Sequence, residues 1–271
     1  ILFGAMASAS RGLGDLRTRL DSAWRLADAG LRLRTLEDDG TELQSSRVFL
    51  DSAVVEAARR VAGTSVPVTT YFVNSISAGD HSTPYSFATA PPPSRFDEPL
   101  SAGQSAINDW LAADLGVGAG DTVDLTYYAV DSGTRLREET ETFTVAAVVS
   151  TEDAAPEDRS LVPDIPGLTE AANCRDWDPG IPIDLGRIRE KDEAYWEAFG
   201  PLPKVYVSHA DAGRMWSNRF GRYTAMRFPA ANGAPADIAD ALLREAAPGR
   251  LGFLFRPVRE QGLEASRNAV D

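Results

Sequence analysis

The sequence has few of the residues that most often carry chemistry. It holds one cysteine, Cys174, and two histidines, His81 and His209, among 271 residues. A single cysteine excludes an internal disulfide and a cluster of thiolate metal ligands. Neither histidine lies near a second metal-type ligand in sequence, so we expect both to be structural or solvated.

The sequence also lacks long apolar runs and an excess of basic over acidic residues. No run approaches the ~20 apolar residues that a membrane-spanning helix needs. The 27 basic residues face 40 acidic ones, which gives a formal charge of -13 that repels phosphate backbones and anionic headgroups. We therefore expect no nucleic-acid partner. Because the chain begins at Ile1 rather than Met, we interpret it as a piece of a longer protein.

Common catalytic motifs are absent from the sequence. It has no G-x-S-x-G elbow and no S-x-x-K. The glycines of 116–120 follow a predicted helix and precede a strand, the reverse of a phosphate-binding loop. We expect no catalytic residue, no cofactor and no enzyme activity. A carboxylate pair for sugar hydrolysis stays open, because only the separation in space decides it.

Three carboxylates, Asp176, Asp178 and Asp184, resemble the start of a calcium loop. The position twelve along from Asp176 is Arg187 rather than a bidentate Glu. We expect no metal here and assign these side chains to helix capping and loop bracing. Whether the loop 176–184 binds calcium stays open.

Hydrophobic periodicity in the first third predicts the order αββαβ. The expected elements are a helix over 15–29 stopped by Gly30, a hairpin from 31–34 to 43–50 with 48–50 extended, a helix capped by Asp51, and strands at 66–73 and 84–88. The proline run 91–93 predicts a linker and a domain boundary at residue 99.

The remaining chain alternates helical and extended patterns around one long loop. We predict a helix over 107–115 ending at Gly116, a hairpin of 123–127 with 143–149 around a turn at 131–133, and a surface loop over 150–184. Further elements are a helix over 184–199, a strand at 204–207, a helix from Ser208 to Trp216, and a strand, helix and strand at 223–228, 235–246 and 251–255.

Aromatic residues concentrate in and after the long loop. Trp177, Tyr195, Trp196 and Trp216 at such spacings are more often core than ligand site. Trp177 is predicted to be a buried packing anchor, because the loop has little regular backbone bonding to hold it. The alternative is a secreted binding module for a sugar or peptide with these aromatics in its site, or a hydrolase.

Four ordered motifs carry a family resemblance. Residues 162–168 (VPDIPGL), 174–184 (CRDWDPGIPID), 189–196 (REKDEAYW) and 219–225 (RFGRYTA) resemble a segment of large bacterial ABC transporter permeases of the FtsX/MacB-like superfamily. The similarity extends to 74–76, 83–86, 107–112 and 120–122, and so covers the chain from about Trp24 onward.

The resemblance implies an extracytoplasmic domain held between membrane helices at the bacterial inner membrane. It implies an α+β, two-lobed fold, with a split lobe from 1–99 and 220–271 and an inserted lobe from 100–219. A cytoplasmic ATPase subunit would act through the membrane helices to drive export or transmit force, with a second permease copy as a further partner. The family has no catalytic residue in this domain, so Trp177, Asp176, Asp178, Asp184, Tyr195, Trp196 and Trp216 are candidates for structural or partner-binding roles.

Overall fold

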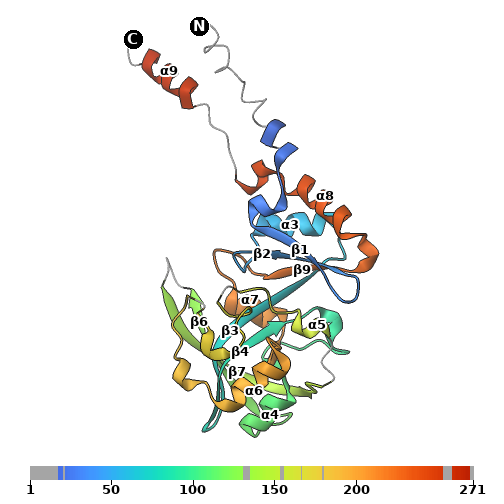
Figure 1. Ribbon diagram of the computed structural model, residues 1–271, viewed down its shortest axis with the longest axis vertical. Coiled ribbons are helices and arrows are strands. Elements are labelled where there is room, and N and C mark those ends of the chain that lie inside the picture. The colour runs from blue at the N-terminus through green and yellow to red at the C-terminus, as the bar shows by residue number, and fades with distance from the viewer. Residues whose placement is uncertain are drawn as a thin grey trace.

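The computed structural model describes residues 18–20, 22–130, 135–152, 156–165, 167–178, 180–252 and 258–268. They form a mixed α+β fold whose strands follow the order β1-β2-β9-β3-β4-β8-β5-β7-β6. Pairing of β3 with β6 closes the strands from β3 onward into a barrel. Figure 1 shows two stacked parts, the barrel below and a smaller α/β body above it.

The α/β body holds two helices against a short antiparallel sheet. It contains β1 (Leu31–Thr35), β2 (Thr41–Ser45), β9 (Ala225–Phe228), the start of β3, α3 (Ser52–Val61) and α8 (Pro235–Glu245). β9 lies between β2 and β3 and pairs with both. Leu43 and Met226, opposite each other in the sheet, join both helices in one buried cluster. Because side chains alternate along a strand, Glu42 points to the other face.

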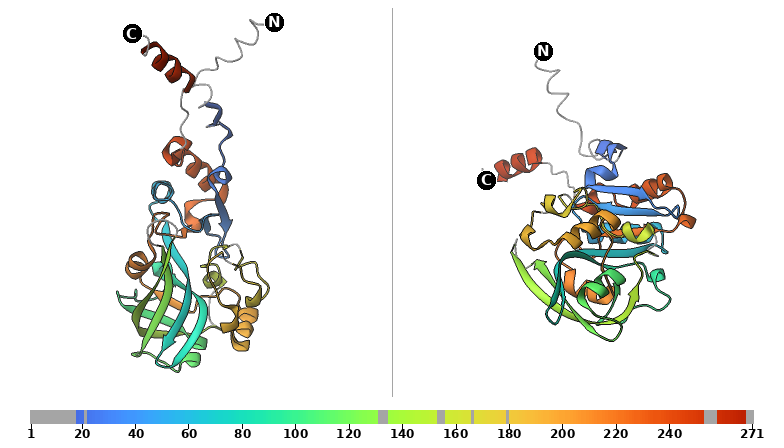
Figure 2. Two further views of the ribbon diagram at one scale, coloured as in Figure 1. Left: turned by 90° about the vertical axis from the view of Figure 1, so that its left-hand side faces the viewer. Right: turned by 60° about the horizontal axis from the view of Figure 1, so that its bottom comes forward.

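The barrel combines strands from distant parts of the chain. It contains β3 (Val66–Ala78), β4 (His81–Ala90), β5 (Gln104–Asn108), β6 (Thr122–Val130), β7 (Leu136–Val149) and β8 (Val205–Val207). The pairs β4–β8 and β5–β7 are parallel, and the other barrel pairs are antiparallel. Figures 1 and 2 show α4 (Asp109–Leu115) and α7 (His209–Trp216) at opposite ends of the barrel, where Leu111 and Trp216 join its buried cluster.

The other helices lie in the long loop and near the chain ends. They are α5 (Pro156–Arg159), α6 (Glu190–Phe199), α9 (Val258–Asn268) and the 3-10 turns Leu26–Ala29, Pro93–Arg95, Cys174–Asp176, Leu185–Arg187, Ala230–Asn232 and Pro248–Leu251. Within the described ranges, no helix is both long and apolar enough to cross a membrane.

Several predicted helix boundaries are confirmed by their caps. The Asp51 carboxylate accepts a hydrogen bond from the Ala53 N–H at 2.9 Å, and Ser208 Oγ accepts one from the Asp211 N–H at 3.1 Å. Gly30 and Gly116 end their helical segments in the left-handed conformation, with φ of 69° and 70°. The two predicted hairpins and the strand 204–207 are also present.

The first predicted helix is interrupted in the structure. Residues 18–20 and 22–23 are helical, Arg25 is extended, and a 3-10 turn follows at Leu26–Ala29, whereas 15–17 and 21 lie outside the described residues. Trp24 explains the break, because its buried indole N–H donates to the Ala246 carbonyl at 3.3 Å. A contact 222 residues away therefore overrides local helical periodicity.

Two helices begin later than predicted. Ile107 belongs to β5, and Asn108 caps α4 by accepting the Leu111 N–H at 2.8 Å. Asp184 caps only the 3-10 turn Leu185–Arg187, and α6 begins at Glu190 behind a capping box of Arg189 and Asp192. In both cases the first apolar residues that were predicted to be helical belong instead to a strand or a 3-10 turn. Ile107 lies in β5, and Leu185 lies in the 3-10 turn.

Two predicted strands are also corrected. Val48 turns the chain with φ of 68°, and only Leu50 of 48–50 pairs, as a single bridge to Tyr223. A 3-10 turn at Pro248–Leu251 replaces the start of the predicted strand 251–255. Residues 253–255 and the predicted turn 131–133 lie outside the described residues.

The predicted domain boundaries at residues 99 and 219 remain a prediction. They do not separate the two buried cores, because the barrel takes β3 and β4 from before residue 99 and β5 to β8 from after it. The sheet of the α/β body does combine early strands with β9, which follows residue 219.

The polar face of the α/β sheet is covered by residues 156–165, which we call the latch. Glu42 is 1% exposed and pairs with Arg227 Nε at 2.6 Å and Arg34 Nη2 at 2.7 Å. Both arginines also donate hydrogen bonds to Ser160 of the latch. Arg227 donates to the Ser160 hydroxyl, and Arg34 donates to the Ser160 carbonyl. The charged face of the body is thereby tied to the long loop.

The latch is also tied to the barrel. Arg95 Nε donates to both oxygens of the buried Asp158 carboxylate, at 2.7 and 2.9 Å. Thr70 of β3 donates to the Leu161 carbonyl at 2.6 Å. Leu161 lies in a small buried cluster with Val68, Ala106, Tyr206 and Ala225, which come from both parts. The latch therefore fixes the body against the barrel.

Candidate functional site

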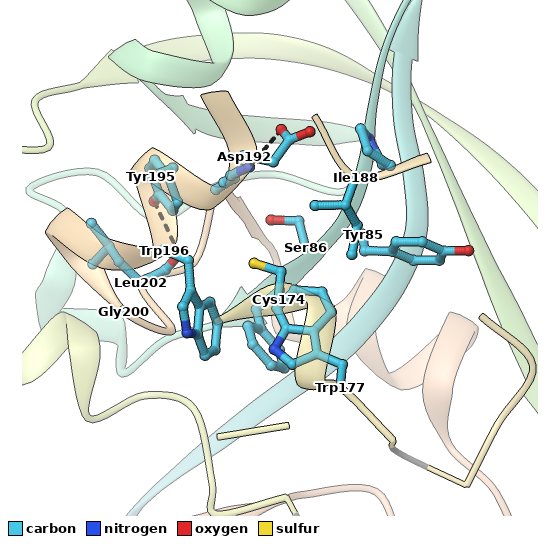
Figure 3. Close-up of a pocket in the computed structure, with 13 residues that line it drawn as sticks. Tyr85, Ser86, Cys174, Trp177, Ile188, Asp192, Tyr195, Trp196, Gly200 and Leu202 are labelled. Carbon is cyan, nitrogen blue, oxygen red and sulfur yellow. Dashed lines mark hydrogen bonds and ion pairs between the residues drawn. The ribbon is translucent and has the colours of Figure 1, made fainter. Parts of the chain in front are cut away.

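Three of the four aromatic residues singled out in the sequence, Trp177, Tyr195 and Trp196, line one small cavity beside the barrel. Its walls are formed by β4, the loop around Cys174 and Trp177, α6 and the segment between α6 and β8 (Figure 3). The cavity measures about 20 Å³. That space holds about one water molecule and excludes a sugar ring or a peptide side chain.

Trp177 forms one wall of the cavity and anchors the long loop. It is 6% exposed, so its predicted burial is confirmed. Its ring meets Trp196 edge to face at 5.0 Å and Phe72 at 5.8 Å between centroids. Such pairs add about 0.5–1.5 kcal/mol each beyond the burial of area. The indole N–H of Trp177 has no hydrogen-bond partner among the described residues, so packing alone holds the ring.

The neighbouring loop is held by Tyr85, which has a rare backbone conformation. Its φ is 38°, which is strained for an aromatic residue. The ring stacks on Phe72 at 5.8 Å, and the hydroxyl accepts the Asp184 N–H at 2.5 Å. The strain at Tyr85 thus places a hydroxyl where the loop has an otherwise unpaired backbone donor.

Lys204 is the residue that sequence analysis missed. It is 3% exposed and directly precedes β8, and its ammonium lies 4.0 Å from the centroid of Trp110 and 4.4 Å from that of Tyr195. Asp192 Oδ1 is 4.0 Å away. Burial lowers the pKa of Lys204 to about 8, against the opposing pull of the Asp192 carboxylate. We call Lys204, Trp110, Tyr195 and Asp192 the lysine cage.

The scarcity of lysine in the sequence could have pointed to this site. Only two of the chain's 27 basic residues are lysines, and both Lys191 and Lys204 lie around this cavity and its adjoining charges. The cage holds a compact ammonium, whose charge is concentrated at one point within reach of both rings.

A charge network closes the cage on the α6 side. Arg189 donates to Asp192 Oδ2 from Nε and to Asp114 Oδ2 from Nη2, both at 2.7 Å. Asp114 also accepts from Thr83 and Lys191. Burial acts to raise the pKa of Asp114, but hydrogen bonds from Lys191, Thr83 and Arg189 outweigh it, so this pKa lies below its ordinary value. The carboxylate is therefore held in its charged form.

Cys174 lines the cavity but is chemically quiet. Burial raises the pKa of its thiol to about 12, and Glu193 adds to the effect. A thiol is a poor nucleophile compared with a thiolate. Cys174 thus acts as a small apolar wall residue that packs in one buried cluster with Trp177 and Trp196 (Figure 3).

The other predicted site residues do not converge here. Trp216 stacks on Tyr71 at 5.3 Å in the barrel core. Asp176 accepts from the Asn173 amide, Asp184 caps its turn, and Asp178 is exposed. No group of three or more histidine, cysteine or acidic side chains suited to a metal occurs among the described residues.

The two histidines each bond a backbone carbonyl. His81 Nδ1 lies 2.9 Å from the Leu115 oxygen, and His209 Nε2 lies 2.9 Å from the Pro91 oxygen. Since a carbonyl only accepts, each nitrogen carries a proton and donates. Burial lowers the pKa of His209, the Pro91 bond opposes this, and the Arg222 charge adds to it.

No protein-family model matches the sequence, and no curated protein matches it significantly. The loop around Trp177 and α6 thus pack tightly against the barrel, and the basic groups of Lys204 and Arg189 face the carboxylates of Asp192 and Asp114. The cavity has room for about one water molecule beside the Lys204 ammonium.

Proposed function

We propose that the chain is a non-catalytic extracytoplasmic domain of an FtsX/MacB-like ABC transporter permease. In this role it would couple ATP hydrolysis by a cytoplasmic ATPase to export or to force transmission. A second permease copy would pack beside it. The finer form of the fold, a two-lobed MacB-like arrangement, belongs to the same proposal.

One observation carries the proposal: the described chain enters and leaves the α/β body side by side. Trp24 donates to the Ala246 carbonyl, and Leu26 and Leu251 pack on the same buried cluster. Figures 1 and 2 place these segments at the end of the molecule away from the barrel, with α9 beyond them. A domain with adjacent ends can be held between two neighbouring membrane helices.

The fixed joint between body and barrel gives further support. A domain that transmits force needs parts that move together, and the latch binds the barrel through Asp158 and the body through Ser160. Removing the partner of the buried Asp158 carboxylate costs about 2–3 kcal/mol, so this contact resists separation of the two parts. The rival role as a sugar- or peptide-binding module has less support, because the aromatic cavity admits only about one water.

The test is cysteine labelling of the full-length protein in its bacterial membrane. The buried, high-pKa Cys174 gives a low background, so Ser217→Cys, at an exposed position, supplies the reactive thiol. We expect a membrane-impermeant maleimide to label Ser217→Cys in intact spheroplasts. We also expect the labelled protein to stay with carbonate-washed membranes.

Labelling only after lysis would place the domain in the cytoplasm and overturn the proposal. Labelled protein released by the carbonate wash would favour the secreted binding module. The unsubstituted protein is the control for any residual labelling at Cys174.

A further inference from the structure

The connection from α7 to β9 carries a tight turn with an exposed ring. Asn218 and Gly221 exchange both backbone hydrogen bonds at 3.1 Å, which leaves Arg219 and Phe220 as the two residues at the tip. The Asn218 side chain also accepts the Phe220 N–H at 2.8 Å. Phe220 nevertheless leaves 49% of its surface exposed. A well-bonded turn therefore holds an aromatic ring in solvent.

The turn is fitted closely against the segment before α3. Gly221 has φ of 155°, and a Cβ at this position would overlap the carbonyl oxygen of Leu50. Just after the turn, the Tyr223 carbonyl accepts a hydrogen bond from the Leu50 N–H at 2.8 Å. Because both sides of the turn are fixed, the position of Phe220 is set by the fold.

Three arginines surround the turn. The Arg219 guanidinium lies 4.6 Å from the Phe220 centroid, and those of Arg222 and Arg59 each lie 5.7 Å from the Tyr223 centroid. Arg59 also donates to the Tyr223 hydroxyl at 3.4 Å. We call Arg59, Arg219, Phe220, Arg222 and Tyr223 the arginine patch.

The charges of the patch are not neutralised by any carboxylate in the part of the chain that the structure describes. Within the described part of the chain, no carboxylate lies within 4.0 Å of these three guanidinium groups. By contrast, Arg60, the next residue along α3, pairs with Glu245 at 2.7 Å. Unpaired positive charge is unexpected on a chain of net charge -13, where carboxylates are abundant.

We propose that the arginine patch binds the acidic face of a second protein, with Phe220 as the apolar anchor. Arginine and aromatic residues are the types enriched at protein interfaces and at their energetic centres. Arg59 donates only to the Tyr223 hydroxyl and Arg222 to the His209 carbonyl at 3.3 Å, so the carboxylates of an acidic face would supply the opposite charge that these guanidinium groups lack among the described residues. This inference does not rest on the proposed transport role.

A lipid surface fits the patch less well. A bilayer is broad and flat, so anionic headgroups would face the acidic surface around the patch as well as the patch itself. A protein partner can restrict its contact to the turn and to Arg59 of α3. Since α3 belongs to the body and the turn follows the barrel helix α7, such a partner would contact both parts of the molecule.

The experiment measures fluorescence anisotropy of a labelled oligo-glutamate peptide with one central leucine. We expect binding that weakens as salt rises. The double variant Arg219→Glu/Arg222→Glu should weaken it about tenfold or more. The matched control is Arg137→Glu/Arg175→Glu, with the same charge change at two exposed arginines elsewhere, which should weaken it less than about threefold.

The ring is tested by Phe220→Ser, which should weaken binding several-fold, whereas Phe220→Leu should retain it. Equal losses in the patch and control double variants would overturn the proposal, because they would indicate non-specific charge attraction. Absence of peptide binding by the wild type would also overturn it. Patch-dependent binding to phosphatidylglycerol vesicles without peptide binding would show that the partner class is wrong.

Discussion

The two halves of the long loop are held by different forces. The latch, residues 156–165, is held by arginines that reach Asp158, Ser160 and Asp164. The second half, around Trp177, is held by stacked and edge-to-face rings together with hydrogen bonds such as that from the Asp184 N–H to the Tyr85 hydroxyl. Both halves lack long regular elements, so each depends on side chains for its order.

The difference predicts distinct responses to conditions. Partly exposed ion pairs weaken with salt, whereas packing of buried rings does not depend on it. The latch joins the body to the barrel, and the aromatic half covers only the barrel side. We therefore expect salt to loosen the joint between the parts before it loosens the loop around Trp177.

The largest effect is expected from the aromatic half. Trp177→Ala should lower the free energy of unfolding by about 3–5 kcal/mol, because it removes a buried ring and leaves a cavity. Urea unfolding measures this, with Leu185→Ala as the control at a 37% exposed site of the same loop. A mutant that melts like wild type but loses a sugar or peptide ligand would make the cluster a binding site.

The next largest effect is expected from the lysine cage, as a dependence of the free energy of unfolding on pH. The pKa of Lys204 falls from 10.5 to about 8 on folding, so between these values the unfolded chain binds more protons. Stability from this group should therefore rise as pH increases from about 8 to about 10.5, by on the order of 3 kcal/mol.

Lys204→Met removes the titrating group and keeps most of its volume. The difference in unfolding free energy between wild type and Lys204→Met should change across this pH range. Burial raises the pKa of Tyr195, the tyrosine of the cage, well above this range, and the ionisation of tyrosines elsewhere affects both proteins alike. A pH-independent difference would mean that the Lys204 ammonium is not desolvated.

The latch should give a smaller, salt-dependent effect. Arg95→Ala leaves the Asp158 carboxylate, 2% exposed, without its bidentate partner and should cost about 2–3 kcal/mol. Arg137→Ala, which removes an exposed pair with Glu139, should cost under about 1 kcal/mol. If salt changed the Trp177→Ala loss more than the Arg95→Ala loss, the contrast between the two halves would be wrong.

The smallest effects are expected at the histidines. His81→Ala and His209→Ala each remove one hydrogen bond to a backbone carbonyl and should cost about 1 kcal/mol. Neither change should alter the metal content of the purified protein. Stoichiometric zinc lost on either substitution would show a metal site that the described geometry does not contain.

Local signals in the sequence located most elements. Asp51, Ser208 and Gly116 mark helix ends through bonds made within a few residues, so their sequence context is enough. The burial of Trp177 also follows from its own loop, which offers few other large apolar groups. These features were predictable because their causes lie close together in sequence.

Other features depend on partners far along the chain. Trp24 breaks a helix to reach Ala246, and Ile107 lies in a strand because β7 and β8 pair on both sides of it. Lys204 looks like an ordinary strand-edge charge until Trp110 and Tyr195 are placed around it. Barrel closure through β3 and β6 has no local signature either.

The position of β9 has a consequence for how the chain folds during synthesis. β9 lies between β2 and β3, so these two early strands cannot join until residues 225–228 have been made. Contacts this distant in sequence form slowly. The β1–β2 hairpin and the start of β3 thus expose unpaired edges while about 150 further residues emerge at some 5–20 residues per second. A nascent chain of this kind would need a chaperone, or rapid export, to keep those edges from pairing with other chains.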